Sequence, residues 1–219
     1  MSTSFDFFDR DQDVLISQGH LPHWEQSGKT YFITFRTADS LPVEVAERWH
    51  QKRRDWLLRH NIAPDGENWE DRLAELPERF QRQFHETISL EFHQHLDAGH
   101  GACVLRQKEL AAEVGRSLRH FDGQRYRMGD FIVMPNHIHA LVQFLGGTKL
   151  KKQCYSWKKF TATKINRTLG QSGTFWQKES FDHLVRSLEQ FERFQRYIAD
   201  NPSKAGLKEG EYLYYQRAK

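Results

Sequence analysis

The chain has 219 residues, with 32 Lys and Arg against 29 Asp and Glu, so its formal net charge at neutral pH is +3. Hydrophobic residues make up 38% and aromatic residues 13%, which excludes a chain that is disordered throughout. Two cysteines in a chain of this length exclude a disulfide framework. The start is acidic and no apolar run approaches the roughly 18 residues that span a bilayer, so we expect a cytoplasmic protein with no membrane partner.

Charge is distributed unevenly along the chain. Residues 149–219 hold 15 Lys and Arg against 7 Asp and Glu, whereas residues 1–148 hold 17 against 22. The stretch from Lys149 to Arg167 contains seven basic residues and no acidic one. Such a stretch favours a polyanionic partner, and the alternative is a helix face that is simply solvated.

The first half of the chain predicts a strand and several helices. Aromatic and β-branched residues predict an interior strand at 30–37, and apolar residues at helical spacing predict a helix from 43 to 60. The segment 61–100 is polar and weakly periodic, and we expect a helical insertion there, either a specificity element or plain scaffold. A clearer amphipathic helix runs from 105 to 121 and ends at Asp122-Gly123.

The second half predicts a β-hairpin and two helices. Strands at 125–134 and 137–145 are separated by the short break Pro135-Asn136. Helices follow at about 153–169 and 187–200, the first stopped by Gly170 and the second by Asn201-Pro202. This order of elements predicts an α+β domain with helices packed on an antiparallel sheet.

Two histidines in the second hairpin strand form a candidate metal site. His137 and His139 are two residues apart, so on a strand both rings project from one face. The pair can offer two nitrogens to one metal ion. The alternative is a structural role for two half-buried polar residues. The apolar segments on either side favour the metal, because buried imidazoles are costly without a partner.

The residue string Val133-Met-Pro-Asn-His-Ile-His-Ala-Leu-Val142 resembles the His-hydrophobic-His signature of the single-tyrosine HUH nucleases, and in detail that of the REP-associated tyrosine transposases. In the block that follows Trp176-Gln177, the family often has an aromatic residue where this chain has Ser180. The resemblance covers roughly residues 29–210 and is strongest from 125 to 207. Further blocks resemble the family's C-terminal blocks in the same order: Ser156-Trp-Lys-Lys-Phe-Thr161, Ser172-Gly-Thr-Phe-Trp-Gln177, Phe181-Asp-His183, Arg196-Tyr-Ile-Ala-Asp-Asn-Pro202 and Lys204-Ala-Gly206.

The resemblance implies the HUH nuclease fold, a ferredoxin-like antiparallel sheet with helices packed on it. It implies a single transposase-like domain at 29–210 that includes the insertion at about 61–100. An N-terminal extension would then occupy 1–28 and a C-terminal tail 211–219. Members of this family look self-sufficient, which favours a monomer, whereas wider relatives form dimers with composite sites.

A nuclease of this family needs a tyrosine nucleophile. The family's Tyr-Ile-x-x-Asn-Pro block corresponds here to the segment that starts at Tyr197, so the resemblance implies that Tyr197 is the catalytic residue. On the helix 187–200, Tyr197 lies about 100° from the centre of the apolar stripe, at its boundary. The alternative is a tyrosine packed at the edge of the stripe with its hydroxyl in water. The stripe consists of Leu188, Phe191, Phe194 and Ile198. The tyrosines that follow the histidines in the chain, and are therefore the candidates, are Tyr155, Tyr197, Tyr212, Tyr214 and Tyr215.

The resemblance also implies a third metal ligand, an amide or acidic side chain one turn after the tyrosine. Asn201 occupies that position, although an asparagine before a proline can equally terminate a helix. Asp182 and His183 are second-choice ligands. Mixed nitrogen and oxygen ligands suit either Mg²⁺ or Mn²⁺, and no organic cofactor is expected.

The basic stretch would then bind DNA. Cations at helical spacing can contact phosphates, and aromatic side chains can stack on unpaired bases. The resemblance implies a short palindromic hairpin with a single-stranded flank as the ligand. The predicted DNA-binding residues are Lys151, Lys152, Trp157, Lys158, Lys159, Lys164, Arg167 and Trp176, with Phe160 as a further stacking surface.

The activity implied by the resemblance is cleavage and strand transfer of single-stranded DNA through a covalent 5′-phosphotyrosine. Such a reaction needs no ATP, because the phosphodiester energy is kept in the covalent link. Two rivals stay open: a non-catalytic protein that binds hairpin DNA or RNA, and a metal-dependent hydrolase that uses water in place of tyrosine.

Overall fold

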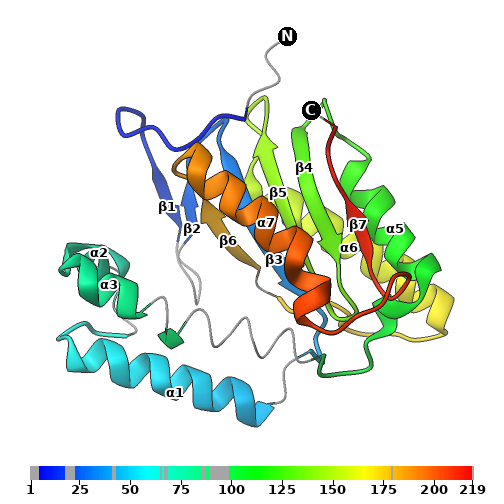
Figure 1. Cartoon of the computed structure of the whole chain (residues 1–219), viewed down its shortest axis with the longest axis horizontal. Coiled ribbons are helices and arrows are strands. Elements are labelled where there is room, and N and C mark those ends of the chain that lie inside the picture. The colour runs from blue at the N-terminus through cyan, green and yellow to red at the C-terminus, as the bar shows by residue number, and fades with distance from the viewer. Residues whose placement is uncertain are drawn as a thin grey trace.

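A five-stranded antiparallel sheet in the order β6-β3-β5-β4-β7 lies at the centre of the computed structural model (Figure 1). The structure describes residues 5–17, 23–40, 43–64, 66, 69–84, 87–88, 99–178 and 180–218. The strands of this sheet are β3 (Thr30–Arg36), β4 (Tyr126–Val133), β5 (His137–Phe144), β6 (Phe181–Leu184) and β7 (Leu213–Tyr215). β3 and β5 are buried along almost their whole length, as strands are when both faces of a sheet are covered.

The connections give the sheet a ferredoxin-like topology. The order along the chain is β3, α5 (Lys108–Arg119), β4, β5, α6 (Leu150–Leu169) and β6, which is a β-α-β-β-α-β unit with the spatial order β6-β3-β5-β4. The predicted α+β class is therefore confirmed. The interior position of the strand at 30–36 and the β4–β5 hairpin are confirmed as well.

Helices cover both faces of the sheet. On one face, α5 and α6 pack against side chains that include Ile33 of β3. On the other face, α7 (Leu188–Lys204) packs through Phe191 and Ile198 against Phe32 of β3, and Figure 1 shows it crossing that face. Because side chains alternate along a strand, consecutive residues such as Phe32 and Ile33 enter different cores. We call the second face the α7 face.

The described part of the insertion between β3 and α5 contains three helices. They are α1 (Val43–Arg59), α2 (Trp69–Glu75) and α3 (Glu78–Phe84), and they share a hydrophobic cluster of their own around Trp56 and Leu57. The predicted helix at 43–60 is confirmed, and α2 and α3 lie within the predicted insertion, whose residues 89–98 fall outside the described part of the chain. No helix in the described ranges is long and apolar enough to cross a bilayer.

Several short elements were not predicted. A 3-10 turn, η2 (Val104–Arg106), precedes α5, and a small two-stranded sheet pairs β1 (Leu15–Ser17) with β2 (His23–Glu25). The edge strands β6 and β7 have four and three residues. Segments this short show no periodicity of their own, so pairing with distant strands defines them.

Helix α7 continues past its predicted end at Asn201-Pro202. It runs to Lys204, with Ala205 as its C-cap. Pro202 removes one backbone donor from the last turn, while the amide of Ala205 still donates to the Asn201 carbonyl at 3.0 Å. The positive φ of Gly206, 65°, then ends the helix. Asn201 therefore lies inside the helix, and its alternative role as the helix terminator is wrong.

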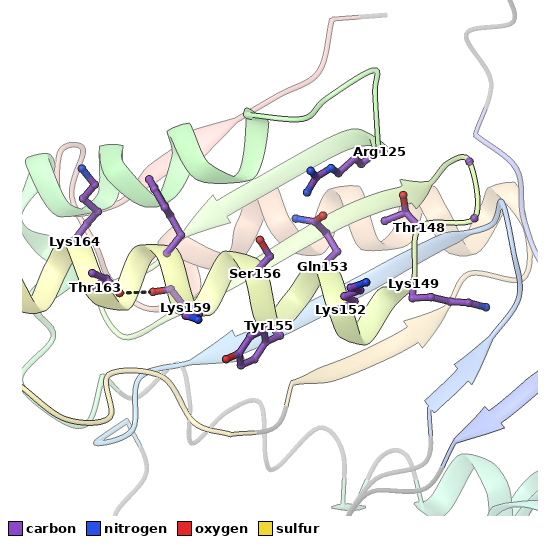
Figure 2. Close-up of a pocket in the computed structure, with 13 residues that line it drawn as sticks. Arg125, Thr148, Lys149, Lys152, Gln153, Tyr155, Ser156, Lys159, Thr163 and Lys164 are labelled. Atoms are coloured by element: carbon purple, nitrogen blue, oxygen red, sulfur yellow. Dashed lines mark hydrogen bonds between the residues drawn. The ribbon is translucent and has the colours of Figure 1, made fainter.

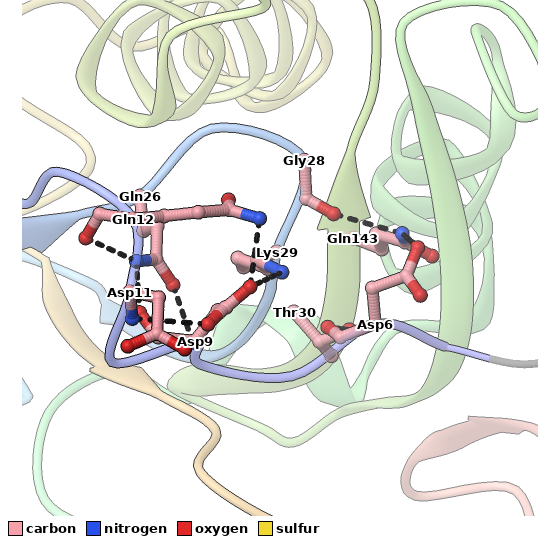
Figure 3. A network of polar contacts seen from close by, with 9 residues as sticks. All are labelled: Asp6, Asp9, Asp11, Gln12, Gln26, Gly28, Lys29, Thr30 and Gln143. Carbon is pink, nitrogen blue, oxygen red and sulfur yellow. Dashed lines mark hydrogen bonds and ion pairs between the residues drawn. The ribbon is translucent and has the colours of Figure 1, made fainter.

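The N-terminal segment packs on the α7 face, and Figure 3 shows its polar contacts, among them that of Asp6 with Gln143. The rings of Phe5 and Phe7 lie 4.8 and 5.7 Å from that of Phe191 in α7, measured between centroids. Gln143 of β5 donates its amide to the Asp6 carboxylate at 2.6 Å. Residues of the predicted extension at 1–28 therefore contribute to the packing of the domain.

The C-terminal segment also joins the sheet. β7 pairs with β4, with Phe131 opposite Tyr215. The backbone amide of Arg217 donates to Asp130 at 3.0 Å. The predicted tail at 211–219 thus supplies an edge strand, a pairing that local sequence pattern does not reveal.

We expect the double substitution Phe5→Ala/Phe7→Ala to lower the free energy of unfolding by about 2–3 kcal/mol, because two half-buried rings leave the packing around Phe191. Urea denaturation followed by circular dichroism measures this change. The exposed Arg10 supplies the control, since Arg10→Ala removes no ring from that core. Equal stability of the double variant and the control would contradict a packing role for this segment.

Candidate active site

His137 and His139 lie side by side on β5 and face α7. Both side chains are buried, and their ring centroids are 4.7 Å apart. In the register with β3, His137 lies opposite Arg36 and His139 opposite Thr34. The two rings are neighbours on one face of the sheet, as their spacing predicts.

The turn between β4 and β5 orients the His137 ring. Asn136 donates its side-chain amide to the His100 carbonyl at 2.8 Å, which directs its Oδ1 toward His137. Nδ1 of His137 lies 2.7 Å from that Oδ1. An amide oxygen only accepts, so Nδ1 of His137 carries the proton and donates. Nε2 is then the nitrogen with a lone pair, which is the form that a metal-binding imidazole needs.

His139 joins the sheet to the candidate nucleophile. Its Nδ1 lies 2.7 Å from the Thr34 hydroxyl, and its Nε2 lies 3.5 Å from the Tyr197 hydroxyl of α7. Phe32 stacks on the His139 ring at 5.4 Å and meets the Tyr197 ring edge-on at 5.9 Å. The side chain of Tyr197 is half-buried, so it is partly open to solvent while its hydroxyl faces His139.

Aromatic packing sets the position of α7 over the histidines. Phe194 stacks on Phe32 with 4.3 Å between centroids and an angle of 4°. Phe191 and Ile198 are buried, as predicted for the apolar stripe. Leu188, the first residue of the helix, is exposed, so its assignment to the stripe was wrong because the packed interface begins one turn later.

The other candidate tyrosines have no described contact with the histidine pair. Tyr212 and Tyr214 also lie on the α7 face, Tyr212 in the cluster around Phe32 and Tyr214 opposite Ile132 of β4. Tyr155 is exposed on α6, on the opposite side of the sheet, and Tyr215 stacks on Phe131 in the core beneath α5 and α6. Burial, followed by the charge of Asp130, raises the pKa of Tyr214. Among the contacts of the described residues, it is Tyr197 that meets the histidine pair.

The predicted third ligand, Asn201, lies on the side of α7 that faces the sheet. Asn201 is fully buried one turn after Tyr197, so its side chain is enclosed between the helix and the sheet. Within the described ranges no three His, Cys, Asp or Glu side chains gather into a metal-binding group. Asn201 stays the predicted third ligand.

The two second-choice ligands point to different faces. Asp182 of β6 lies opposite Ile33, so it projects to the side of α5 and α6, away from the histidine pair. Its assignment as an alternative ligand was wrong because strand alternation separates it from the site. His183 lies opposite Phe32 on the α7 face, where its Nε2 is 2.9 Å from the amide of Gln190.

We expect Asn136→Ala to weaken Mn²⁺ binding about 10–100-fold, because it removes the acceptor that fixes the His137 tautomer. Isothermal titration with Mn²⁺ measures the affinity. Gln190→Ala is the matched control, since it removes an amide beside His183 on the same face. If both variants bind Mn²⁺ as the unmodified chain does, Asn136 does not support a metal ligand.

A basic groove runs along the outer side of α6, and Figure 2 shows the residues that line it. Its volume is about 810 Å³. Three of the predicted DNA-binding residues, Lys152, Lys159 and Lys164, line it. The exposed rings of Tyr155 and Phe160 line it too, and a lysine lies within 6 Å of each ring. α6 and α7 cover different faces, so the groove and the histidine pair lie on opposite sides of the sheet.

The remaining predicted DNA-binding residues divide between surface and core. Lys151 and Arg167 are exposed on α6, and Lys158 donates to the carbonyls of residues 177 and 178. Trp157 is 2% exposed and donates to the Tyr126 hydroxyl, and Trp176 is 4% exposed. Neither indole is available to stack on a base, and both assignments were wrong because these rings fill the core under α6.

Sequence analysis missed three residues that shape these two sites. The sequence pattern places Asn136 in a turn, and the signal for its role is an amide side chain next to a candidate ligand. Thr34 has no local signal, because it meets His139 only through the pairing of β3 with β5. Tyr155 was considered only as a nucleophile, whereas its exposed ring lines the groove.

Comparisons with known proteins find a remote likeness to a solved structure. No family model and no curated protein matches the chain. A solved structure, that of a REP-associated tyrosine transposase bound to a REP hairpin, aligns with a TM-score of 0.46 and 13% sequence identity. The alignment covers 87% of this chain and 76% of that one. This is a remote likeness of fold, and it assigns neither a family nor an activity to this chain.

Proposed function

We propose that this protein is a metal-dependent tyrosine nuclease and strand transferase that acts on single-stranded DNA next to a hairpin. The contact between the Tyr197 hydroxyl and Nε2 of His139, 3.5 Å, carries the proposal, because it brings a nucleophile to a histidine pair. The sequence blocks that resemble REP-associated tyrosine transposases support the same reaction. Because members of that family look self-sufficient, we propose that the protein acts as a monomer.

His137 and His139 would hold the metal ion, with Asn201 as the third protein ligand. A bound Mg²⁺ or Mn²⁺ would polarise the scissile phosphate and stabilise the negative charge that develops on it. An amide oxygen is an ordinary ligand for either ion, and the fixed tautomer of His137 leaves a ring nitrogen that can bind a metal.

Tyr197 would attack the phosphorus atom. The bond from its phenolic oxygen to phosphorus forms, the bond from phosphorus to the 3′-oxygen breaks, and that oxygen leaves as a 3′-hydroxyl with the proton that the phenol lost. A phenol has a pKa of about 10 in water, so positioning is needed for this attack at neutral pH. Packing of Phe32 and Phe194 supplies it by holding α7 over the histidines. Attack by another 3′-hydroxyl on the phosphotyrosine would rejoin strands.

The decisive experiment uses labelled DNA hairpins with a single-stranded flank, taken from repeated palindromes of the host genome, incubated with the protein and Mn²⁺. We expect a covalent protein–DNA adduct that survives SDS, together with a free 3′-hydroxyl on the released strand. Cleavage without an adduct would support a hydrolase that uses water. Binding with neither cleavage nor adduct would support a non-catalytic hairpin-binding protein.

The groove on α6 is the proposed contact for the hairpin. We expect Lys152→Ala/Lys159→Ala/Lys164→Ala to weaken hairpin binding at least about tenfold and to lower the salt dependence, because each lost phosphate contact reduces the slope of log K against log salt by about 0.9. Fluorescence anisotropy at several salt concentrations measures both. Lys108→Ala is the control, because Lys108 is an exposed lysine at the start of α5, outside the groove and outside the predicted DNA-binding set. An unchanged salt slope in the triple variant would place the hairpin elsewhere.

A further inference from the structure

The α7 face carries two cations next to the candidate site that the proposed reaction does not use. Arg36, the last residue of β3, lies opposite His137. Lys204, in the last turn of α7, has its Nζ 5.5 Å from the centroid of the Tyr197 ring. With His139 between His137 and Tyr197, the five residues form a row in which each contacts or pairs with the next.

Arg36 is held in place at one end of this row. Its Nε donates to Oε1 of Gln177 at 2.6 Å, and the backbone amide of Gln177 donates to the Arg36 carbonyl at 2.9 Å. Burial lowers the pKa of Arg36 to about 10, so the side chain is still a cation at neutral pH. An anchored, partly desolvated guanidinium interacts strongly with a phosphate, because its planar donors match two phosphate oxygens.

Lys204 differs from Arg36 in being exposed, at the other end of the row. Its long side chain can follow a flexible strand, and an ammonium group binds phosphate as a point charge. Two cations on either side of a candidate nucleophile can bind two separate phosphates of one strand, whereas one cation can bind only one. A polyanion whose charges repeat along its length is the ligand that such a pair fits.

We propose that Lys204 and Arg36 bind the phosphates on either side of the scissile one, so that a single DNA strand crosses the α7 face from Lys204, past Tyr197 and the histidines, to Arg36. Gln177 is a positioning residue, which orients the guanidinium without touching the strand. This inference rests on the proposed function, because the scissile phosphate is defined by Tyr197.

The test measures binding of a single strand in a protein that cannot form the covalent link. In a Tyr197→Phe background, anisotropy of a fluorescent, mixed-sequence single-stranded oligonucleotide is titrated with Mn²⁺ present at several salt concentrations. We expect Arg36→Met and Lys204→Met each to weaken binding about tenfold and to lower the salt slope by about 0.7, the value for one phosphate of a single strand. Compared with Arg36→Met, Arg36→Lys should recover most of the salt slope but less of the affinity. Lysine keeps the positive charge but lacks the planar pair of donors of the guanidinium.

Arg59→Met is the matched control, because Arg59 is an exposed arginine on α1, outside the row. Gln177→Ala should weaken binding less than Arg36→Met and leave the salt slope unchanged, since the guanidinium remains. Melting temperatures verify that each variant folds. If Arg36→Met does not fold, Lys204→Met and Arg36→Lys decide the matter. An unchanged affinity and slope in Lys204→Met, or an effect equal to that of Arg59→Met, overturns the proposal.

Failure of this proposal is distinguishable from failure of the proposed function. The unmodified protein reports on the reaction through its SDS-resistant adduct, and the Tyr197→Phe proteins report on the strand path through binding alone. Adduct formation with unaffected binding in the cation variants rejects the path and keeps the reaction.

Discussion

Tyr197→Phe is expected to lower the yield of the covalent protein–DNA adduct by at least about 10³-fold, because it removes the hydroxyl that would form the bond to phosphorus. The ring keeps its edge contact with Phe32, so the fold and DNA binding should change little. Denaturing gel electrophoresis of labelled hairpin DNA with the variant and Mn²⁺ measures the loss.

Tyr155→Phe is the matched control for this substitution. It removes a tyrosine hydroxyl from the opposite side of the sheet, where the ring is 62% exposed in the α6 groove. Its adduct yield should equal that of the unmodified protein. An adduct that persists in Tyr197→Phe would assign the nucleophile to another residue and would remove the observation on which the proposed function depends.

His137→Ala and His139→Ala are each expected to weaken Mn²⁺ binding about a hundredfold or more. Loss of a ligand should cost at least as much as loss of a residue that only orients a ligand, which costs about 10–100-fold. Adduct formation should fall with metal affinity and recover partly at high Mn²⁺ concentration. Titration calorimetry measures the affinity, and the gel assay at increasing Mn²⁺ measures the recovery. Both side chains are buried, so melting temperatures are needed to separate loss of metal from loss of packing.

His183→Ala separates this metal site from a general role of histidines on the α7 face. His183 lies on the same face, where it contacts Gln190 and the ring of Phe194. We expect its removal to leave the Mn²⁺ affinity within about threefold of the original. Removal of a residue that supports a metal ligand costs about tenfold or more, so a smaller change means that His183 does not support the metal. Unchanged metal-dependent activity in the double variant His137→Ala/His139→Ala would assign the pair a structural role and reject the metal site.

The two strands that carry the site were predictable because their signals are local. β3 and β5 are runs of aromatic and β-branched residues long enough to identify, and Pro135-Asn136 marks the turn before His137. The spacing of the histidines put their rings on one face, and the spacing of Tyr197 and Asn201 put them one helical turn apart. These relations depend only on the periods of a strand and a helix.

The aromatic residues of α6 show where such reasoning failed. Trp157 and Phe160 are three residues apart in a basic stretch, which predicts both as surfaces for stacking. Trp157 shares its stripe with Ile165 and is buried in the core, whereas Phe160 is 49% exposed in the groove. A helix with a low contrast between its faces does not reveal which aromatic side chain faces the sheet, so packing against β4 and β5 decided it.

By itself, the sequence determined the α+β class, the histidine pair and the position of Tyr197 one turn before Asn201, because each follows from a local period or motif. Only the tertiary structure decided that His139 meets Thr34 and that Arg36 lies opposite His137, since those contacts depend on the register between strands about a hundred residues apart. It also placed the basic groove on the side of the sheet opposite the candidate site. Charge along a chain says nothing about which face of a sheet a helix will cover, because that choice is made by the burial of its apolar side chains.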